Sequence, residues 1–110
     1  NRTLSFTFEG SDGARKMTAL MDALRTSPLP SIANLYVETY KDYKVGVNGL
    51  PAANVLEFDL DNDHKVIVRP SGTEPKVKVY VFTIGDTERQ ARSIDAHIAG
   101  EMTAYVKKFE

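Results

Sequence analysis

The sequence predicts an α+β domain of two layers, in which an antiparallel sheet of four or slightly more strands is covered on one face by two helices. Three observations indicate this architecture. Several segments alternate apolar and polar residues, the pattern of strands with one buried face. Two other segments, one near each end of the chain, carry apolar residues at helical spacing. Antiparallel sheets commonly bury a single face, and two amphipathic helices are its natural cover.

Length and composition are those of one globular domain. The chain has 110 residues, 42% hydrophobic and 26% charged, and a chain of this size buries roughly 60–70% of its unfolded surface. Its net charge of −1 offers no general attraction for nucleic acid or an anionic membrane, so any anion site must be local. Cysteine is absent, which excludes disulfides and thiolate chemistry and fits a cytoplasmic location. Because the chain begins at Asn1 within strand-like sequence, we expect it to be a fragment of a larger protein.

The first half of the chain predicts a strand, a helix and a second strand. Residues 4–8 alternate as a half-buried strand. The helix that follows has Ser11 or Asp12 as its expected N-cap, and it should end before Pro28. Residues 35–43 are rich in strand formers. The apolar stripe of the helix consists of Met17, Leu20, Met21 and Leu24.

The second half predicts three strands and a longer helix. Residues 54–60, 66–69 and 76–84 have strand patterns, and residues 61–63 form a turn between the first two. Residues 87–90 match a capping box, which predicts that a helix starts there and runs close to the C-terminus. Its apolar side consists of Ala91, Ile94, Ile98, Met102, Tyr105 and Phe109.

The most informative stretch is the short loop between the last two strands, whose residues 69–76 read RPSGTEPK. Arginine offers a planar fork of donors that matches phosphate oxygens, and the two hydroxyls add neutral donors. Glycine lets main-chain N–H groups turn toward an anion. Two prolines stiffen the loop, so less entropy is lost when a ligand binds. The candidate phosphate-binding residues are Arg69, Ser71, Gly72, Thr73 and Lys76.

A second interpretation of this loop is a polar hairpin turn that binds nothing, because Ser-Gly-Thr is common turn chemistry. It is not a Walker A loop, since G-x-x-x-x-G-K-[ST] is absent and no helix follows. Lys78 shares a strand face with Lys76, and a solvated position is favoured for it. Glu74 has the wrong charge sign for a phosphate contact, so we expect it to pair with a cation or meet a sugar hydroxyl.

Two other groups of residues do not support a site. Asp59, Asp61 and Asp63 are spaced like the start of a calcium loop, but the positions that need glycine and glutamate hold other residues. We expect the first aspartate to face outward on a strand and the other two to serve the turn. His64 and His97 are expected in a turn and on the polar side of a helix, and neither has a convincing nucleophile partner.

The loop and two other segments resemble the α-D-phosphohexomutases, the family of phosphoglucomutases and phosphomannomutases. Residues 69–76 are similar to the phosphate-binding loop in the C-terminal domain of that family. The sequence LPAANVLEF at 50–58 resembles the strand lead-in of the bacterial phosphoglucomutase branch, and FTFEGSDG at 6–13 resembles its entry into the last domain. EPKVK at 74–78 is closer to that branch than to the phosphoglucosamine mutases. The resemblance covers most of the chain.

This resemblance implies that residues 1–110 are the TATA-box-binding-protein-like C-terminal domain of an isomerase of carbohydrate metabolism. Such an enzyme moves a phosphoryl group between C1 and C6 of a hexose, with glucose 1-phosphate and glucose 6-phosphate favoured as substrates. A phosphoserine and a Mg²⁺ site in other domains would perform the transfer. The fragment alone would therefore be inactive, with no catalytic residue or metal ligand. Its implied partners are the sugar phosphate and the other domains of the same chain, with no role for nucleic acid or a membrane.

The implied task of this domain is to hold the phosphate that is not reacting. Arg69 would bind it in a bidentate manner, Ser71 and Thr73 would donate hydroxyls, and amides near Gly72 and Thr73 would complete the cradle. Two alternatives stay open. A phosphomannomutase, phosphoglucosamine mutase or phosphopentomutase would use the same grip. A stand-alone binding module would instead display exposed aromatic residues among basic ones. The aromatic candidates are Tyr36, Tyr40, Tyr43 and Tyr80.

Overall fold

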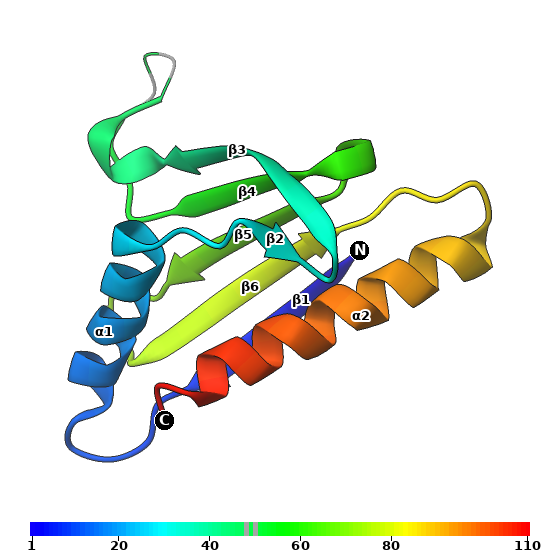
Figure 1. The fold of residues 1–110 in the computed structure, drawn as a ribbon. Helices are drawn as coiled ribbons and strands as arrows, with labels where there is room; N and C mark the ends of the chain where they lie inside the picture. Colours follow the sequence, from blue (N-terminus) through cyan, green and yellow to red (C-terminus); the bar gives the residue numbers. More distant parts are fainter. Residues whose placement is uncertain (48, 50) are drawn as a thin grey trace.

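The structure, a computed structural model, describes residues 1–47, 49 and 51–110. Leu50, the first residue of the segment at 50–58, lies outside the described residues. Within them, strands form one antiparallel sheet and two helices pack on one of its faces (Figure 1). In chain order the elements are β1 (Arg2–Thr7), α1 (Gly13–Thr26), β2 (Ser31–Ile32), β3 (Leu35–Asp42), β4 (Leu56–Leu60), β5 (Lys65–Pro70), β6 (Lys76–Phe82) and α2 (Glu88–Lys107).

The sheet has the strand order β1-β6-β5-β4-β3-β2, and each neighbouring pair is antiparallel. Strands β3 to β6 form a simple meander, whereas β1 comes from the start of the chain and pairs with β6 at one edge. Short 3₁₀ turns follow β3 at Tyr43–Val45 and β4 at Asp61–Asp63. The predicted two-layer α+β class, with an antiparallel sheet of four or slightly more strands, is confirmed, and the described sheet has six strands.

The core lies between the sheet and the two helices. Strand alternation supplies the sheet side of the core: Val77, Val79 and Val81 of β6 are 0% exposed, while the residues between them face away from the helices. The stripe predicted for α1 is confirmed at its three buried members and is partly buried at Met17. The largest fully buried side chains include Phe8, Phe58, Leu20, Leu24, Ile32, Leu56, Ile98 and Met102.

The buried face of α2 differs from the predicted one. Ile98 and Met102 are buried as expected, but Ala91, Ile94, Tyr105 and Phe109 are only partly buried. The face also includes Asp95, Ala99 and Val106, which α2 buries beside Ile98 and Met102 and which the prediction lacked. The carboxylate of Asp95 is reached by the Nε of Arg2 at 2.8 Å. This ion pair connects α2 to β1, and the two elements run side by side in Figure 1. A buried carboxylate needs such a partner.

Half of the predicted capping box forms at the start of α2. The Oγ1 of Thr87 accepts a hydrogen bond from the N–H of Gln90 at 3.1 Å, as expected for an N-cap. The side chain of Gln90 does not return to Thr87, and instead accepts from the N–H of Asp86 at 2.6 Å. The N–H group that Gln90 binds therefore belongs to Asp86, one residue before Thr87, whose N–H the capping box predicts as the donor.

The predicted side-chain cap of α1 is wrong. Asp12 stands at the N-cap position, but its carboxylate accepts no capping hydrogen bond from the first turn. It forms ion pairs with Arg15 at 3.0 Å and Lys16 at 3.5 Å instead.

Gly13, the first residue of α1, packs so closely against the main chain that a Cβ there would lie 2.2 Å from the carbonyl oxygen of Phe8.

His64 follows the predicted turn at 61–63, but its side chain is only 2% exposed. Its Nδ1 accepts a hydrogen bond from the N–H of Ile84 at 3.1 Å, and its carbonyl oxygen accepts from the N–H of Leu60 at 2.8 Å. The ring thus joins the β4–β5 turn to the segment that leaves β6. The other histidine, His97, is exposed on α2, as predicted.

The sheet face opposite the helices carries a compact charge network formed by Lys41, Tyr43, Glu57, Asp59 and Lys65, which we call the Glu57 network. Glu57 is 5% exposed and accepts from the Tyr43 hydroxyl at 2.9 Å and from Lys41 Nζ at 3.3 Å. Lys65 Nζ lies 3.6 Å from the same carboxylate, and Lys41 Nζ lies 3.1 Å from that of Asp59. Asp59 faces away from the helices, as predicted, but it is half-buried in this network.

The two carboxylates of the network have shifted pKa values of opposite sign. Burial raises the pKa of Asp59 above its ordinary 3.8, and a hydrogen bond with Glu57 raises it further. Burial also acts to raise the pKa of Glu57, but hydrogen bonds from Asp59, Tyr43 and Lys41 outweigh it and hold this pKa below 4.5. As the pH falls, Asp59 is therefore protonated before Glu57, which keeps its negative charge to lower pH.

Replacing His64 should show that its ring nitrogen holds the end of β6. We expect His64→Leu to leave the N–H of Ile84 without its partner and to lose about 1–3 kcal/mol of unfolding free energy in urea titrations. His64→Asn is the matched control, because its Oδ1 can accept in place of Nδ1. The N–H of Ile84 should lose hydrogen-exchange protection in the leucine variant and keep it in the asparagine variant. Equal loss of protection in both would contradict the role of this bond.

Neutral variants of the two carboxylates should shift stability in opposite directions. Because the pKa of Asp59 is raised by folding, its ionisation removes stability as the pH rises above 3.8 through the raised value. Asp59→Asn should therefore gain unfolding free energy over the parent across that window. The lowered pKa of Glu57 means that its charge stabilises the fold above 4.5, a contribution lost as the pH falls through the folded value.

Glu57→Gln should thus lose stability at neutral pH and approach the parent in acid. Urea unfolding of both variants at several pH values between 3 and 7 measures the two trends. Parallel pH dependence in both variants would contradict the opposite shifts of the two pKa values.

Candidate functional site

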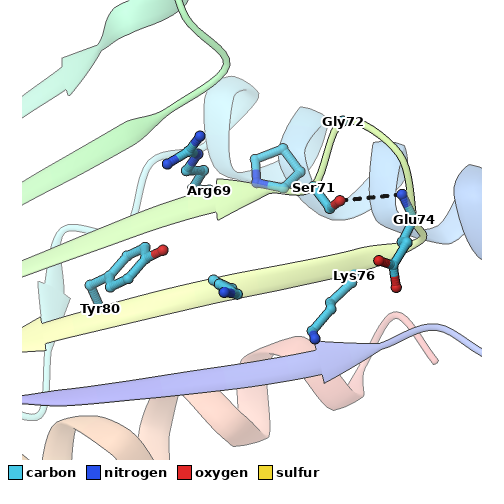
Figure 2. A pocket seen from close by; sticks show the side chains of 8 residues that line it. Arg69, Ser71, Gly72, Glu74, Lys76 and Tyr80 are labelled. Atoms are coloured by element: carbon cyan, nitrogen blue, oxygen red, sulfur yellow. Dashed lines mark hydrogen bonds between the residues drawn. The ribbon is translucent and has the colours of Figure 1, made fainter.

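A cavity of about 320 Å³ opens on the face opposite the helices, where β5 turns into β6. Figure 2 shows the side chains around it, which come from both strands and from the loop between them. The lining residues are Arg69, Pro70, Ser71, Gly72, Glu74, Lys76, Lys78 and Tyr80.

Strand alternation and register bring the basic residues of the cavity together. On β5 the valines at 66 and 68 are buried, which directs Arg69 to the open face. On β6 the same alternation directs Lys76, Lys78 and Tyr80 there. Arg69 is the direct cross-strand partner of Lys78. The cavity is thus a consequence of which residues the two strands must bury.

The loop is held in shape by one of its own hydroxyls. The Oγ of Ser71 accepts from the N–H groups of Thr73 and Glu74, both at 3.2 Å, and the second of these bonds is drawn in Figure 2. The N–H of Ser71 donates to the carbonyl oxygen of Lys76 at 2.7 Å, which closes the base of the loop. The conformation is a serine turn of the kind that orders loops without a ligand.

Four of the five predicted phosphate-binding residues line the cavity, namely Arg69, Ser71, Gly72 and Lys76. Thr73 does not line it. Its N–H is bonded to Ser71, and its Oγ1 lies 3.4 Å from the Ser71 hydroxyl. In this conformation the amide of Thr73 is therefore not directed at an anion, in contrast to the predicted cradle. Phosphate binding by the five residues remains a prediction.

Four residues outside the predicted set also line the cavity: Pro70, Glu74, Lys78 and Tyr80. The sequence placed Lys78 on a solvated face, although its alternation with Lys76 already put it on the same side as the anion-binding candidate. For Glu74 we expect a cation partner or a sugar hydroxyl; it forms no ion pair within the described part of the chain, and the sugar contact stays a prediction.

The cavity is electrostatically different from the Glu57 network on the same face. In the network, Lys41 and Lys65 lie within 4.0 Å of carboxylates. By contrast, among residues 1–47, 49 and 51–110 no carboxylate forms an ion pair with Arg69, Lys76 or Lys78. Like charges directly opposite each other destabilise a sheet, and an anion bound between them would offset that repulsion.

The aromatic candidates for a nucleic-acid surface do not gather on one patch. Tyr36 is 72% exposed at β3, whereas Tyr40 packs its ring on Phe58 with 5.3 Å between centroids. Tyr43 is bonded to Glu57 in the charge network. Of the predicted tyrosines, Tyr80 alone lines the cavity.

The same described residues offer neither a metal-ligand cluster nor a membrane-spanning helix. They contain no group of three or more His, Cys, Asp or Glu side chains placed to hold a metal ion. Asp59 lies beside Lys41, and the carboxylate of Asp61 accepts from the N–H of Tyr36 at 3.2 Å. Neither helix combines the length and the apolar character needed to cross a membrane.

Comparisons with known proteins point to one family. The phosphoglucomutase of Staphylococcus saprophyticus is 37% identical over 91 residues, which cover 73% of this chain and 16% of that protein. The phosphoglucomutase of Staphylococcus haemolyticus is 33% identical over 113 aligned positions, covering 92% of this chain and 20% of that protein. That of Staphylococcus aureus is 35% identical over 89 residues, with 70% and 16% covered.

The chain thus spans a fifth or less of the length of the curated relatives it matches. Residues 11–101 match the model of the family described as phosphoglucomutase/phosphomannomutase, C-terminal domain. This range includes α1, β2 to β6, the 69–76 loop and most of α2. The chain therefore belongs to the phosphoglucomutase/phosphomannomutase C-terminal domain family.

Proposed function

We propose that this chain is the substrate-phosphate-binding domain of a cytoplasmic phosphohexomutase and that the cavity at the 69–76 loop holds a phosphate of the sugar. The observation that carries the proposal is the cavity itself: three cations without ion-pair partners in the described residues converge on a loop inside the family match. The relatives named phosphoglucomutase favour glucose 1-phosphate and glucose 6-phosphate as substrates. A phosphomannomutase, phosphoglucosamine mutase or phosphopentomutase would use the cavity in the same manner.

Within this proposal the domain contributes binding and orientation, and the chemistry belongs to other domains. The transferred phosphoryl group would leave a phosphoserine there and be neutralised with the help of Mg²⁺. The 110-residue chain alone is accordingly proposed to be inactive. Arg69 would supply the charge-assisted contact to the phosphate that is not reacting, with Ser71 and Lys76 beside it. Binding energy at this remote group orients the reacting end of the sugar.

A site that binds the phosphate group rather than one particular side of the sugar suits the proposed phosphoryl transfer. The proposed bisphosphate intermediate must present either of its two ends to the reacting site, so the opposite end is C1-linked in one half-reaction and C6-linked in the other. The cavity is open to solvent along β6 and is lined mainly by cations and loop atoms. Such a site holds the common phosphate and leaves the sugar free to differ in orientation.

The proposal is tested by removing the guanidinium in the full-length enzyme. Arg69→Ala should lower kcat/KM by about 2–4 kcal/mol of transition-state stabilisation, the usual loss when one partner of a charge-assisted contact is removed. Arg69 is an exposed residue on the open sheet face, so the unfolding midpoint should stay close to that of the parent. Steady-state kinetics with glucose 1-phosphate and a urea titration measure the two effects.

Arg89→Ala is the matched control, because Arg89 is an exposed arginine on α2, on the opposite side of the sheet from the cavity. It should retain the kinetics of the parent enzyme. A collapse of the fold in Arg69→Ala without a specific kinetic defect would show that Arg69 is structural and would remove the main support for the proposal.

A further inference from the structure

We infer that Lys78 is a further anion-binding residue of this cavity and that, together with Arg69 and Lys76, it selects a phosphate monoester in its dianionic form. This inference rests on the proposed function and adds the charge state of the ligand and a residue outside the predicted set.

The first argument is the position of Lys78 in the sheet. It stands in the middle of β6 on the open face, where its two cross-strand partners are Arg69 on β5 and Ser5 on β1. One partner has the same charge and the other is neutral. The ammonium group therefore has no acidic neighbour across either strand, and the closest feature of the face is the cavity that it lines.

The second argument is the contrast with two lysines on the same sheet face. Lys41 and Lys65 lie beside Glu57 and Asp59, so this sheet does neutralise its lysines where no ligand is involved. Opposing Arg69 to Lys78 is instead unfavourable in the free protein. A repulsive pair of this kind is relieved when an anion lies between the two side chains.

The third argument is the number of charges. The lining residues of charged type are Arg69, Lys76, Lys78 and Glu74. Three cations and one carboxylate leave a net charge of plus two, and Figure 2 shows Glu74 and Lys76 together at the loop end of the site. A phosphate monoester above its second pKa of about 6 carries the matching charge of minus two. A diester carries a single negative charge and would leave one cation uncompensated.

The test is a titration of the 110-residue chain followed by amide chemical shifts of residues 69–80. The ligands are glucose 6-phosphate, sulfate as a dianion at every pH used, and dimethyl phosphate as a monoanion. At pH 7.5 glucose 6-phosphate and sulfate should bind more tightly than dimethyl phosphate. Lowering the pH to 5 should weaken glucose 6-phosphate, because the ester takes up a proton, and should leave sulfate unaffected.

Lys78→Met removes the charge and keeps the length of the side chain. It should weaken glucose 6-phosphate binding by about five- to tenfold, within the range expected for a lost charged contact that is open to solvent, and should reduce the preference over dimethyl phosphate. Lys44→Met makes the same change in net charge at an exposed position outside the cavity lining, and should bind like the parent. Lys78→Arg should retain binding.

Stability provides the second readout. Because Lys78→Met relieves the repulsion with Arg69, its unfolding midpoint should equal or exceed that of the parent. A lowered midpoint together with unchanged affinity would mean that Lys78 is structural and would overturn the inference. Equal affinities of Lys78→Met and Lys44→Met for glucose 6-phosphate would overturn the inference about Lys78 but would not contradict the proposed phosphate site. Absence of shifts with every anion would overturn both the inference and the proposed function.

Discussion

The burial of one face of β5 and β6 is the constraint on which the rest of the structure depends. Five valines of these strands, at positions 66, 68, 77, 79 and 81, are fully enclosed beneath the helices, and each contributes roughly 1.5–3 kcal/mol by leaving water. A slip of one residue would turn all of them to solvent. Burial of the valines therefore fixes the register of β5 against β6. This register in turn sets which residues are left to form the loop between the two strands.

The position of the charged residues follows from that register. Once the valines are buried, Arg69 must lie opposite Lys78, and the repulsion costs at most about 1 kcal/mol, the scale of one cross-strand pair. The core outweighs this cost several times over. A two-layer domain can thus present like charges together on its open face without losing the fold. Elsewhere on the same sheet face, lysines are paired with carboxylates instead. There Glu57 and Asp59 form ion pairs with Lys41 and Lys65.

Much of the fold and part of the site could be predicted because their signals are local. Alternation and helical spacing identify the helices, β1 and β3 to β6, and the loop chemistry identifies Arg69. The strand β2 has only two residues, Ser31–Ile32, too few for a periodic signal, so this strand was not predicted. The partners of His64 and Asp95 are distant in sequence, 20 and 93 positions away, and only the packed structure brings them together.

The same distinction between local signals and contacts of distant residues explains which residues of the cavity could be predicted from the sequence. The contribution to anion binding that we infer for Lys78 depends on its cross-strand pairing with Arg69, which alternation alone does not give. Thr73 was included because of its hydroxyl, yet the loop folds so that its N–H is bonded to Ser71. Competition between local side-chain bonds and ligand bonds is common for serine and threonine, and residue type alone does not show which of them a loop uses.

The turn at Ser71 is compatible with a role for its hydroxyl in anion binding. A hydroxyl has two acceptor lone pairs and one donor hydrogen. The N–H groups of Thr73 and Glu74 occupy the acceptor side, which leaves the O–H to donate, either to the Thr73 hydroxyl at 3.4 Å or to an anion in the cavity. Accepting two bonds polarises the O–H and strengthens it as a donor. In the proposed phosphate site, the bonds that order the loop would therefore also prepare Ser71 for a phosphate oxygen, and the loop would need little further ordering on binding.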